Sequence, residues 1–247
     1  MIGLGTIINI VAIVVGSLLG LVLGNRLPER TRVAVTSALG LVTLVIGALN
    51  VVALNDPDFV AMVGSAAPLL IVLGALLIGG IIGSLLRIES RLEGVGGAIQ
   101  RRFGSSGRTG SRARFVEAFV DTSLIFVIGP LAILGSISDG LGRGIDQLVL
   151  KSILDGFASL AFAASMGIGV MASAISVGVW QGAVTLLAAL VGPFLSDALI
   201  ASVTATGGVM LLGVGLRILN IKSVPVGDML PALIVAPLLT LAVAQFV

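Results

Sequence analysis

The chain has 247 residues, of which 57% are hydrophobic and only 11% are charged, and its mean hydropathy is +1.21. A soluble domain carries roughly 25% charged residues, so the composition excludes a soluble enzyme, a nucleic-acid-binding protein and a disulfide scaffold. The sequence contains no Cys and no His, which removes thiolate chemistry and the commonest transition-metal ligand. We therefore expect an all-α polytopic membrane protein, embedded in the lipid bilayer, with no cofactor and no enzymatic activity.

Apolar runs bounded by charged, Pro or polar residues predict about eight membrane-spanning helices, each long enough to cross the hydrocarbon core of a bilayer. They cover residues 3–24, 32–54, 64–86, 115–136, 149–171, 175–195, 199–219 and 226–246. The boundary between the fifth and sixth runs is the weakest, because hardly a polar residue interrupts the chain near Gly167–Ser176. The first run lacks a basic leading region and a small-residue cleavage site, so we expect a permanent helix rather than a signal peptide.

The basic residues are distributed unevenly over the connections between these helices. Twelve of the fourteen Lys and Arg residues fall in the connections between helices 1 and 2, 3 and 4, and 7 and 8. With eight spans these connections share one face of the membrane, and connections rich in Lys and Arg lie on the cytoplasmic side. The sequence therefore predicts that both termini lie outside.

The third and fourth helices are joined by residues 87–114, which include the Gly-, Ser- and Arg-rich stretch Gly94–Arg114. We expect a flexible cytoplasmic loop held near anionic lipid headgroups. Nucleotide binding is excluded for these glycines because no strand precedes them.

An internal repeat is visible in the sequence. Residues 63–72 (VGSAAPLLIV) and 226–235 (VGDMLPALIV) share the pattern VG-x3-P-x-LIV. At a constant offset, Thr36, Gly40 and Gly47 match Thr204, Gly208 and Gly215. Helices 1–3 thus look repeated in helices 6–8, and the odd number of crossings between the two triplets gives them opposite orientations. The predicted organisation is a first repeat over 1–86, the loop 87–114, central helices 4 and 5 over 115–174, and a second repeat over 175–247.

Ionisable residues inside membrane spans are costly and tend to face partners or water. Glu117 and Asp121 lie one turn apart on the fourth helix, and Lys151 and Asp155 lie one turn apart on the fifth. The Lys151–Asp155 pair is either an intrahelical ion pair or part of an ion site. Glu117 is either a snorkelling residue at the helix end or a charge site, whereas Asp121 lies deeper and has no adjacent base.

Other predicted site residues are uncharged. Gly129 and Pro130 interrupt the fourth helix, and the carbonyl that Pro frees could coordinate a cation. Asn9 and Thr204, one in each repeat, either line a solute path or hold helices together by hydrogen bonds.

Gly16, Gly20 and Gly24 follow the small-xxx-small spacing that lets two helix backbones approach closely. The stripe serves either packing within one chain or a subunit interface. We take the interface as the prediction, which implies a homodimer.

Several stretches resemble the bacterial inner-membrane family typified by YdfK and YqgA, a family of unknown function. They are MIGLGTIINIVAIVVGSLLG, RLPER, FVEAF with GPLAILGSISDGL, and KSILDGFAS. The resemblance implies a multi-pass protein of the bacterial plasma membrane and supplies no substrate.

The leading hypothesis is a membrane transporter or channel for a small solute, either a cation or a substrate coupled to protons or cations. Asp121, Asp155 and Glu117 would be its charge sites. The alternative is a non-transporting structural or regulatory membrane protein that acts through the basic loop. An intramembrane aspartyl enzyme is the weakest hypothesis, because it would need Asp121 and Asp155 to meet at one depth.

Overall fold

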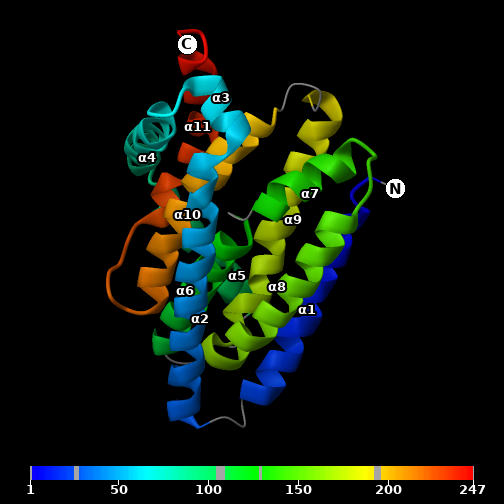
Figure 1. Cartoon of the computed structure of the whole chain (residues 1–247). Helices are drawn as coiled ribbons and strands as arrows, with labels where there is room; N and C mark the ends of the chain where they lie inside the picture. The colour runs from blue at the N-terminus through cyan, green and yellow to red at the C-terminus, as the bar shows by residue number, and fades with distance from the viewer. Residues whose placement is uncertain (1, 25–27, 104–108, 128–129, 192–195, 247) are drawn as a thin grey trace. The chain divides into compact units, whose positions relative to one another are not determined.

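The computed structural model describes residues 2–24, 28–103, 109–127, 130–191 and 196–246, and the regular structure within these ranges is entirely helical (Figure 1). The helices are α1 (Leu4–Gly24), α2 (Glu29–Val51), η1 (Val52–Asn55), α3 (Pro57–Val63), α4 (Ala67–Leu86), α5 (Ile88–Phe103), α6 (Thr109–Val127), α7 (Pro130–Gly140), α8 (Asp146–Met166), α9 (Gly169–Val191), α10 (Asp197–Ile218), η3 (Val226–Met229) and α11 (Ala232–Val243). The all-α class predicted from composition is confirmed.

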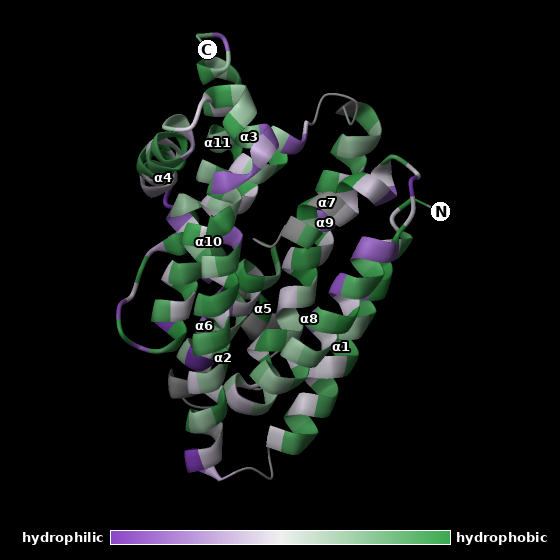
Figure 2. Cartoon of the chain, viewed as in Figure 1, coloured by the Kyte–Doolittle hydropathy of each residue, from purple (hydrophilic) through white to green (hydrophobic). Residues whose placement is uncertain are grey.

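Seven segments of the described chain are long and apolar enough to cross a membrane, and a bent helix pair makes up to eight. The predicted number of about eight spans is therefore confirmed at this level. Hydrophobic residues cover α1 and α4 along most of their length, while hydrophilic residues gather at helix ends and in connections (Figure 2). Exposed side chains such as Leu85, Leu190 and Val179, which are 80%, 73% and 70% exposed, fit a surface that faces lipid rather than water.

The predicted fourth span, 115–136, is not one continuous helix. It consists of α6 and α7, whose axes are bent by 76°. A Pro in a helix interior removes a backbone hydrogen bond and clashes with the preceding turn, and Pro130 is the first residue of α7. Gly129 lies outside the described residues.

The flexibility predicted for Gly94–Arg114 is wrong over most of that stretch, because α5 covers Ile88–Phe103 and α6 begins at Thr109. The helix has a simple explanation in its pattern: Ile88, Leu92, Val95 and Ile99 recur at spacings of three and four residues, which gives one apolar face. The glycines between these apolar residues favoured the prediction of a flexible loop, although the amphipathic period was present.

The fifth and sixth spans separate at Gly167, within the region where the predicted boundary is weakest. Gly167 has φ +93° and ends α8 with a backbone N–H that donates to the carbonyl of Ala163. Glycine adopts this left-handed region without the steric cost that a Cβ carries, so the chain turns here without a polar connection.

The chain divides into two compact units, and their limits fall inside α2 and α5. Unit 1 comprises residues 1–41, 92–127 and 131–192, and its centre is formed by α1, α8, α9 and α6. Unit 2 comprises residues 42–91, 128–130 and 193–247, and contains α3, α4, α10 and α11. The units do not coincide with the predicted repeats: unit 1 holds the first helix of each triplet, and unit 2 holds the third.

In unit 1, α1 and α8 run in the same direction, because Gly5 contacts Leu148, Gly16 contacts Gly156 and Gly24 contacts Ala164. Two odd-numbered spans are expected to be parallel in the eight-span topology. The contacts of Gly5, Gly16 and Gly24 set the register in which the polar side chains of α1 and α8 meet.

Candidate functional site

A buried polar cluster joins three membrane-spanning helices of unit 1. Asp155 on α8 accepts a hydrogen bond from Asn9 Nδ2 on α1, at 2.9 Å to Oδ2. The same amide donates to Gln181 Oε1 on α9 at 3.3 Å. Lys151, one turn before Asp155, forms an ion pair with the same Oδ2. Asn9 and Gln181 are fully buried, and Lys151 and Asp155 are 4% and 7% exposed.

A close approach of α1 and α8 brings Asn9 to Asp155. A Cβ added to Gly20 would lie 2.2 Å from the carbonyl oxygen of Leu160, and one added to Gly24 would lie 2.4 Å from that of Ala164. Only glycine allows two backbones to approach this closely. The short side chain of Asn9 therefore reaches the carboxylate of the neighbouring helix.

This packing corrects the role predicted for the glycine stripe. Gly16, Gly20 and Gly24 all lie against the backbone of α8 within the same chain, so they are not available to a second copy. The homodimer inferred from this stripe loses its physical basis.

Aromatic rings cover the cationic end of the cluster. Lys151 Nζ lies 5.9 Å from the centroid of the Phe126 ring on α6, a distance at which the ring face attracts an ammonium. Phe126 meets Phe162 of α8 edge to face, with centroids 6.4 Å apart. The two rings cover this side of Lys151 with apolar surface.

Several buried polar atoms of unit 1 have no hydrogen-bond partner among the described residues. Two belong to the cluster itself, Asn9 Oδ1 and Gln181 Nε2. The others include the hydroxyl groups of Thr6, Ser17, Ser136, Ser159 and Thr185, and the indole Nε1 of Trp180. Buried polar groups are normally paired, so Asn9 Oδ1 and Gln181 Nε2 leave the cluster with unused hydrogen-bonding capacity.

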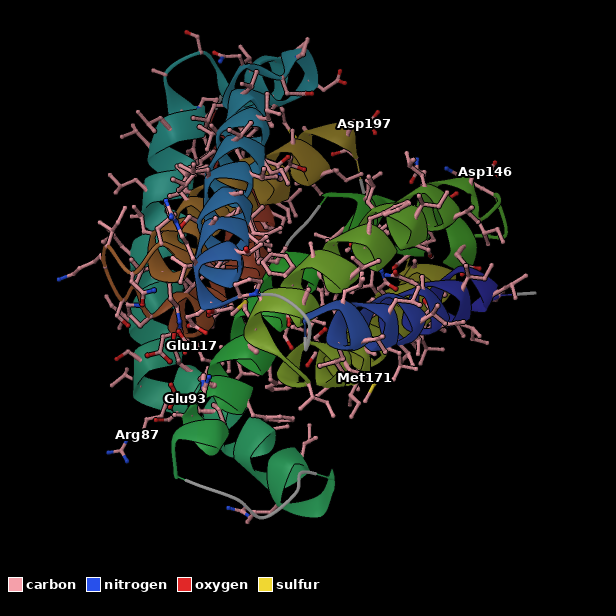
Figure 3. All side chains as sticks on the ribbon, turned by 90° about the horizontal axis from the view of Figure 1, so that it is seen from below. Arg87, Glu93, Glu117, Asp146, Met171 and Asp197 are labelled. Carbon is pink, nitrogen blue, oxygen red and sulfur yellow. The ribbon has the colours of Figure 1, made fainter. Side chains whose placement is uncertain are left out.

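The remaining predicted site residues are scattered. Asp121 is fully buried on α6, whereas Glu117 on the same helix is exposed (Figure 3). Thr204 lies in unit 2, where its hydroxyl donates to the carbonyl of Ile200 at 2.8 Å. Of the predicted set, the structure brings Asn9 and Asp155 together. It assigns Glu117 to the surface and Thr204 to bonding within its own helix.

Sequence reasoning missed the role of Asp139. This residue of α7 is 2% exposed, and its carboxylate lies beside the start of α1. Gly3 N donates to its Oδ1 at 3.0 Å, and Gly5 N donates to its Oδ2 at 3.2 Å. A carboxylate suits the amides that a helix N-terminus leaves unpaired, but no sequence signal links positions 136 residues apart.

Unit 2 contains a second polar cluster, centred on Glu89 at the start of α5. Its carboxylate forms an ion pair with Arg217 of α10 and accepts from Gly227 N at 2.9 Å. Glu89 N donates to Asp228 Oδ1 at 2.8 Å. These contacts fasten the turn after α4 to the end of α10 and to η3, so we assign this cluster a structural role.

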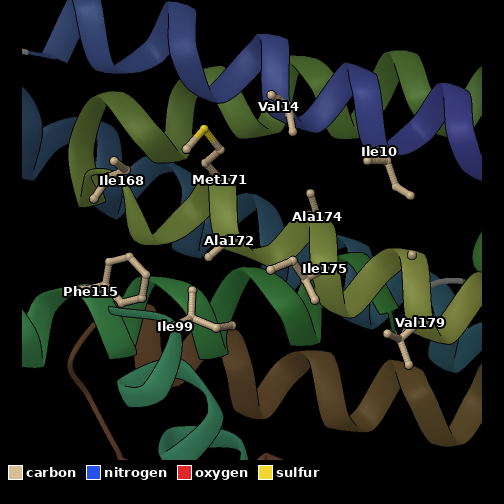
Figure 4. Close-up of a pocket in the computed structure, with 11 residues that line it drawn as sticks. Ile10, Val14, Ile99, Phe115, Ile168, Met171, Ala172, Ala174, Ile175 and Val179 are labelled. Atoms are coloured by element: carbon tan, nitrogen blue, oxygen red, sulfur yellow. The ribbon is translucent and has the colours of Figure 1, made fainter. Parts of the chain in front are cut away.

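A large cavity of unit 1, of about 580 Å³, does not have the chemistry of a polar site. Apolar side chains of α1, α5, α6 and α9 line it, including Ile10, Phe115, Met171 and Ile175 (Figure 4). It offers no side chain that could bind a charged solute. The Asn9–Lys151–Asp155–Gln181 cluster is therefore the better candidate for the functional site.

Comparisons with known proteins agree with the membrane architecture. The chain is 35% identical over 234 residues to the uncharacterized protein YqgA of Escherichia coli (strain K12), covering 94% of each chain. It is 28% identical over 242 residues to the uncharacterized membrane protein YdfK of Bacillus subtilis (strain 168), covering 98% of this chain and 97% of that one. No solved structure matches the chain. The model of the protein family of unknown function DUF554 matches residues 4–241, and the chain belongs to this family.

Proposed function

We propose that the protein is a membrane transporter or channel for a small solute, either a cation or a substrate coupled to protons or cations. The observation that carries the proposal is the Asn9–Lys151–Asp155–Gln181 cluster, which places an ion pair among three membrane-spanning helices. Ionisable groups at such positions are costly, and those that are present commonly mark ion or solute paths. Structural bonding alone explains less, because polar atoms beside the pair lack hydrogen-bond partners within the described part of the chain.

The bent pair α6–α7 adds support. Many secondary transporters place their solute site at discontinuous membrane helices, whose ends present unpaired backbone groups. Here α6 carries the buried Asp121 and the Phe126 ring that covers Lys151, and it ends at the 76° bend. The break thus belongs to the same helix that borders the cluster.

An inverted repeat, proposed from the sequence, is supported by how corresponding helices pack. In unit 1, α1 and α9 run antiparallel, since Asn9 meets Gln181 and Ile10 meets Gly178. In unit 2 the contact pairs are Gly47 with Leu212, Gly208 with Val51, Gly79 with Ala232 and Gly74 with Leu239. Helices related by an in-plane twofold axis must run antiparallel, and all three corresponding pairs do.

For orientation, we propose a bacterial inner-membrane location with both termini outside. The charge distribution of the connections supports this, because α5 and the flanking segments carry seven of the fourteen basic residues. The alternative role, a regulatory protein acting through this region, is favoured by one observation: α5 is an amphipathic helix with exposed Arg91 and Arg101, a pattern suited to a membrane surface.

Flux through purified protein in liposomes tests the transport proposal. Uptake of labelled Na⁺ and Rb⁺ and the internal pH, read by a trapped dye, should change faster than in protein-free liposomes. Asp155→Asn should reduce the flux to that background, whereas Asp146→Asn, at an exposed acid on the same helix, should retain it. Folded protein that moves neither cation nor proton would overturn the proposal, and the regulatory role of α5 would then be preferred.

A further inference from the structure

Asp155 has two chemically different carboxylate oxygens. Oδ2 accepts from both Lys151 Nζ and Asn9 Nδ2. Within the described chain Oδ1 has no hydrogen-bond donor, although the side chain is only 10% exposed. One oxygen is therefore fully engaged, and the other keeps its lone pairs available in a nearly closed site.

The ion pair already balances the charge of this site. Neither α1 nor α9 carries a charged residue, and the buried ionisable groups on α8 are Lys151 and Asp155 alone. From α6 the buried acid is Asp121, and from α7 it is Asp139, which holds the amides at the start of α1. A metal cation at Asp155 would therefore meet an ammonium in contact with the same carboxylate.

A proton and a metal cation make different demands on such a site. A hard metal cation replaces its hydration shell with several oxygen ligands, and no group of three acidic side chains suited to a metal occurs in the described ranges. A proton needs one lone pair and forms a covalent O–H bond. The free Oδ1 meets this demand, and the unpaired Asn9 Oδ1 provides an acceptor for a hydrogen bond within the same cluster.

Hydroxyl groups extend from the pair along the interior of unit 1. Thr6 and Ser17 on α1 are buried without a hydrogen-bond partner among the residues that the structure describes, as are Ser159 on α8 and Thr185 on α9. Thr6 and Ser17 are separated by eleven residues, or about 16 Å along a helix with 1.5 Å rise per residue. A hydroxyl both donates and accepts a hydrogen bond, so these groups supply hydrogen-bonding positions on the helices that surround Asp155.

From these contacts we infer that the coupling ion is the proton, and that it binds at Oδ1 of Asp155 while Lys151 stays on Oδ2. The step is Lys151-NH3⁺···⁻OOC-Asp155 + H⁺ → Lys151-NH3⁺···HOOC-Asp155, in which one O–H bond forms and the site gains one positive charge. The inference rests on the transport function proposed above and selects the proton from the ions it allows.

The amino-acid composition provides a clean assay. The chain has no His, Cys or Tyr and a single Trp, Trp180, next to Gln181 in the cluster. Trp180 fluorescence, followed over the pH range in which the wild type and the variants stay folded, should show a transition that depends on the carboxyl group of Asp155. Infrared difference spectra across the same range should contain the C=O stretch of a protonated carboxyl group that is missing from the spectra of Asp155→Asn.

Matched variants identify the group. Asp155→Asn should abolish both signals, Asp146→Asn and Asp121→Asn should keep them, and Lys151→Arg should also keep them because the guanidinium still pairs with Oδ2. Exchanging choline chloride for NaCl or KCl should leave the transition unchanged.

Other results overturn the inference. No signal in either measurement, a transition lost in Asp121→Asn but kept in Asp155→Asn, or loss in Lys151→Arg alone would place the proton elsewhere. A transition that moves with Na⁺ or K⁺ would show that a metal cation binds the carboxylate. Because these measurements need no transported solute, their failure is distinguishable from an absence of flux in liposomes.

Discussion

A Cβ atom on Gly16 of α1 would lie 2.1 Å from the carbonyl oxygen of Gly156 on α8. The backbones of the two helices thus touch at Gly16 and Gly156. This contact lies one to two helical turns from the place where Asn9, Lys151 and Asp155 meet. Any side chain at position 16 forces the helices apart and withdraws the amide of Asn9 from the carboxylate.

Gly16→Val should therefore destabilise the protein by about 1–3 kcal/mol or more, the usual cost of overpacking. Thermal unfolding of the purified protein in detergent measures this. Gly182→Val is the matched control, because a Cβ at Gly182 on α9 meets nothing within 4 Å. The size of the detergent-extracted particle should be the same for both variants and the wild type. A smaller particle for Gly16→Val alone would restore the stripe as a subunit interface.

Lys151 and Asp155 should be strongly coupled in stability. Removing one partner of a buried pair leaves an uncompensated charge, at a cost of about 3–5 kcal/mol. Lys151→Met or Asp155→Leu alone should thus lower stability markedly, while the double variant should recover about 0.5–3 kcal/mol of the summed loss. Reversible unfolding in mixed micelles gives the cycle. Additive losses would mean that the two side chains do not stabilise one another.

Asp139→Ala should loosen the first turn of α1. The substitution removes the acceptor of Gly3 N and Gly5 N, and losing a helix cap costs about 0.5–2 kcal/mol. Hydrogen–deuterium exchange at the start of α1 should accelerate, with less effect at its end. Asp146→Asn serves as the control because its side chain is exposed. Equal exchange in Asp139→Ala and the wild type would show that water replaces the carboxylate without cost.

Orientation can be tested without background labelling because the sequence contains no Cys. Asp58 and Glu93 are both exposed acids, on α3 and α5. Asp58→Cys should react with a membrane-impermeant maleimide in intact cells, and Glu93→Cys should react only after permeabilisation. The opposite pattern would invert the topology.

Hydropathy was sufficient to find the membrane helices, because each run had to be apolar over the thickness of a bilayer. It was not sufficient for α5, where glycines at positions 94, 96 and 97 obscured an apolar face, or for the extent of the bend at Pro130. Local sequence also identified Lys151 and Asp155 as neighbours on one helix turn. It could not show that Gln181 brings a third helix, α9, into the cluster, or that Asp139 caps α1. Both facts depend on contacts between distant segments.

The hydrogen bond between Asn9 and Asp155 joins positions 146 residues apart, which has a consequence for biosynthesis. At about 5–20 residues per second, Asn9 leaves the ribosome roughly 7–30 s before its acceptor exists. During that interval α1 carries a side-chain amide that hydrocarbon cannot satisfy. The nascent helix must therefore wait beside the insertion machinery or hold water around Asn9, and assembly of unit 1 is completed only after α8 has been synthesised.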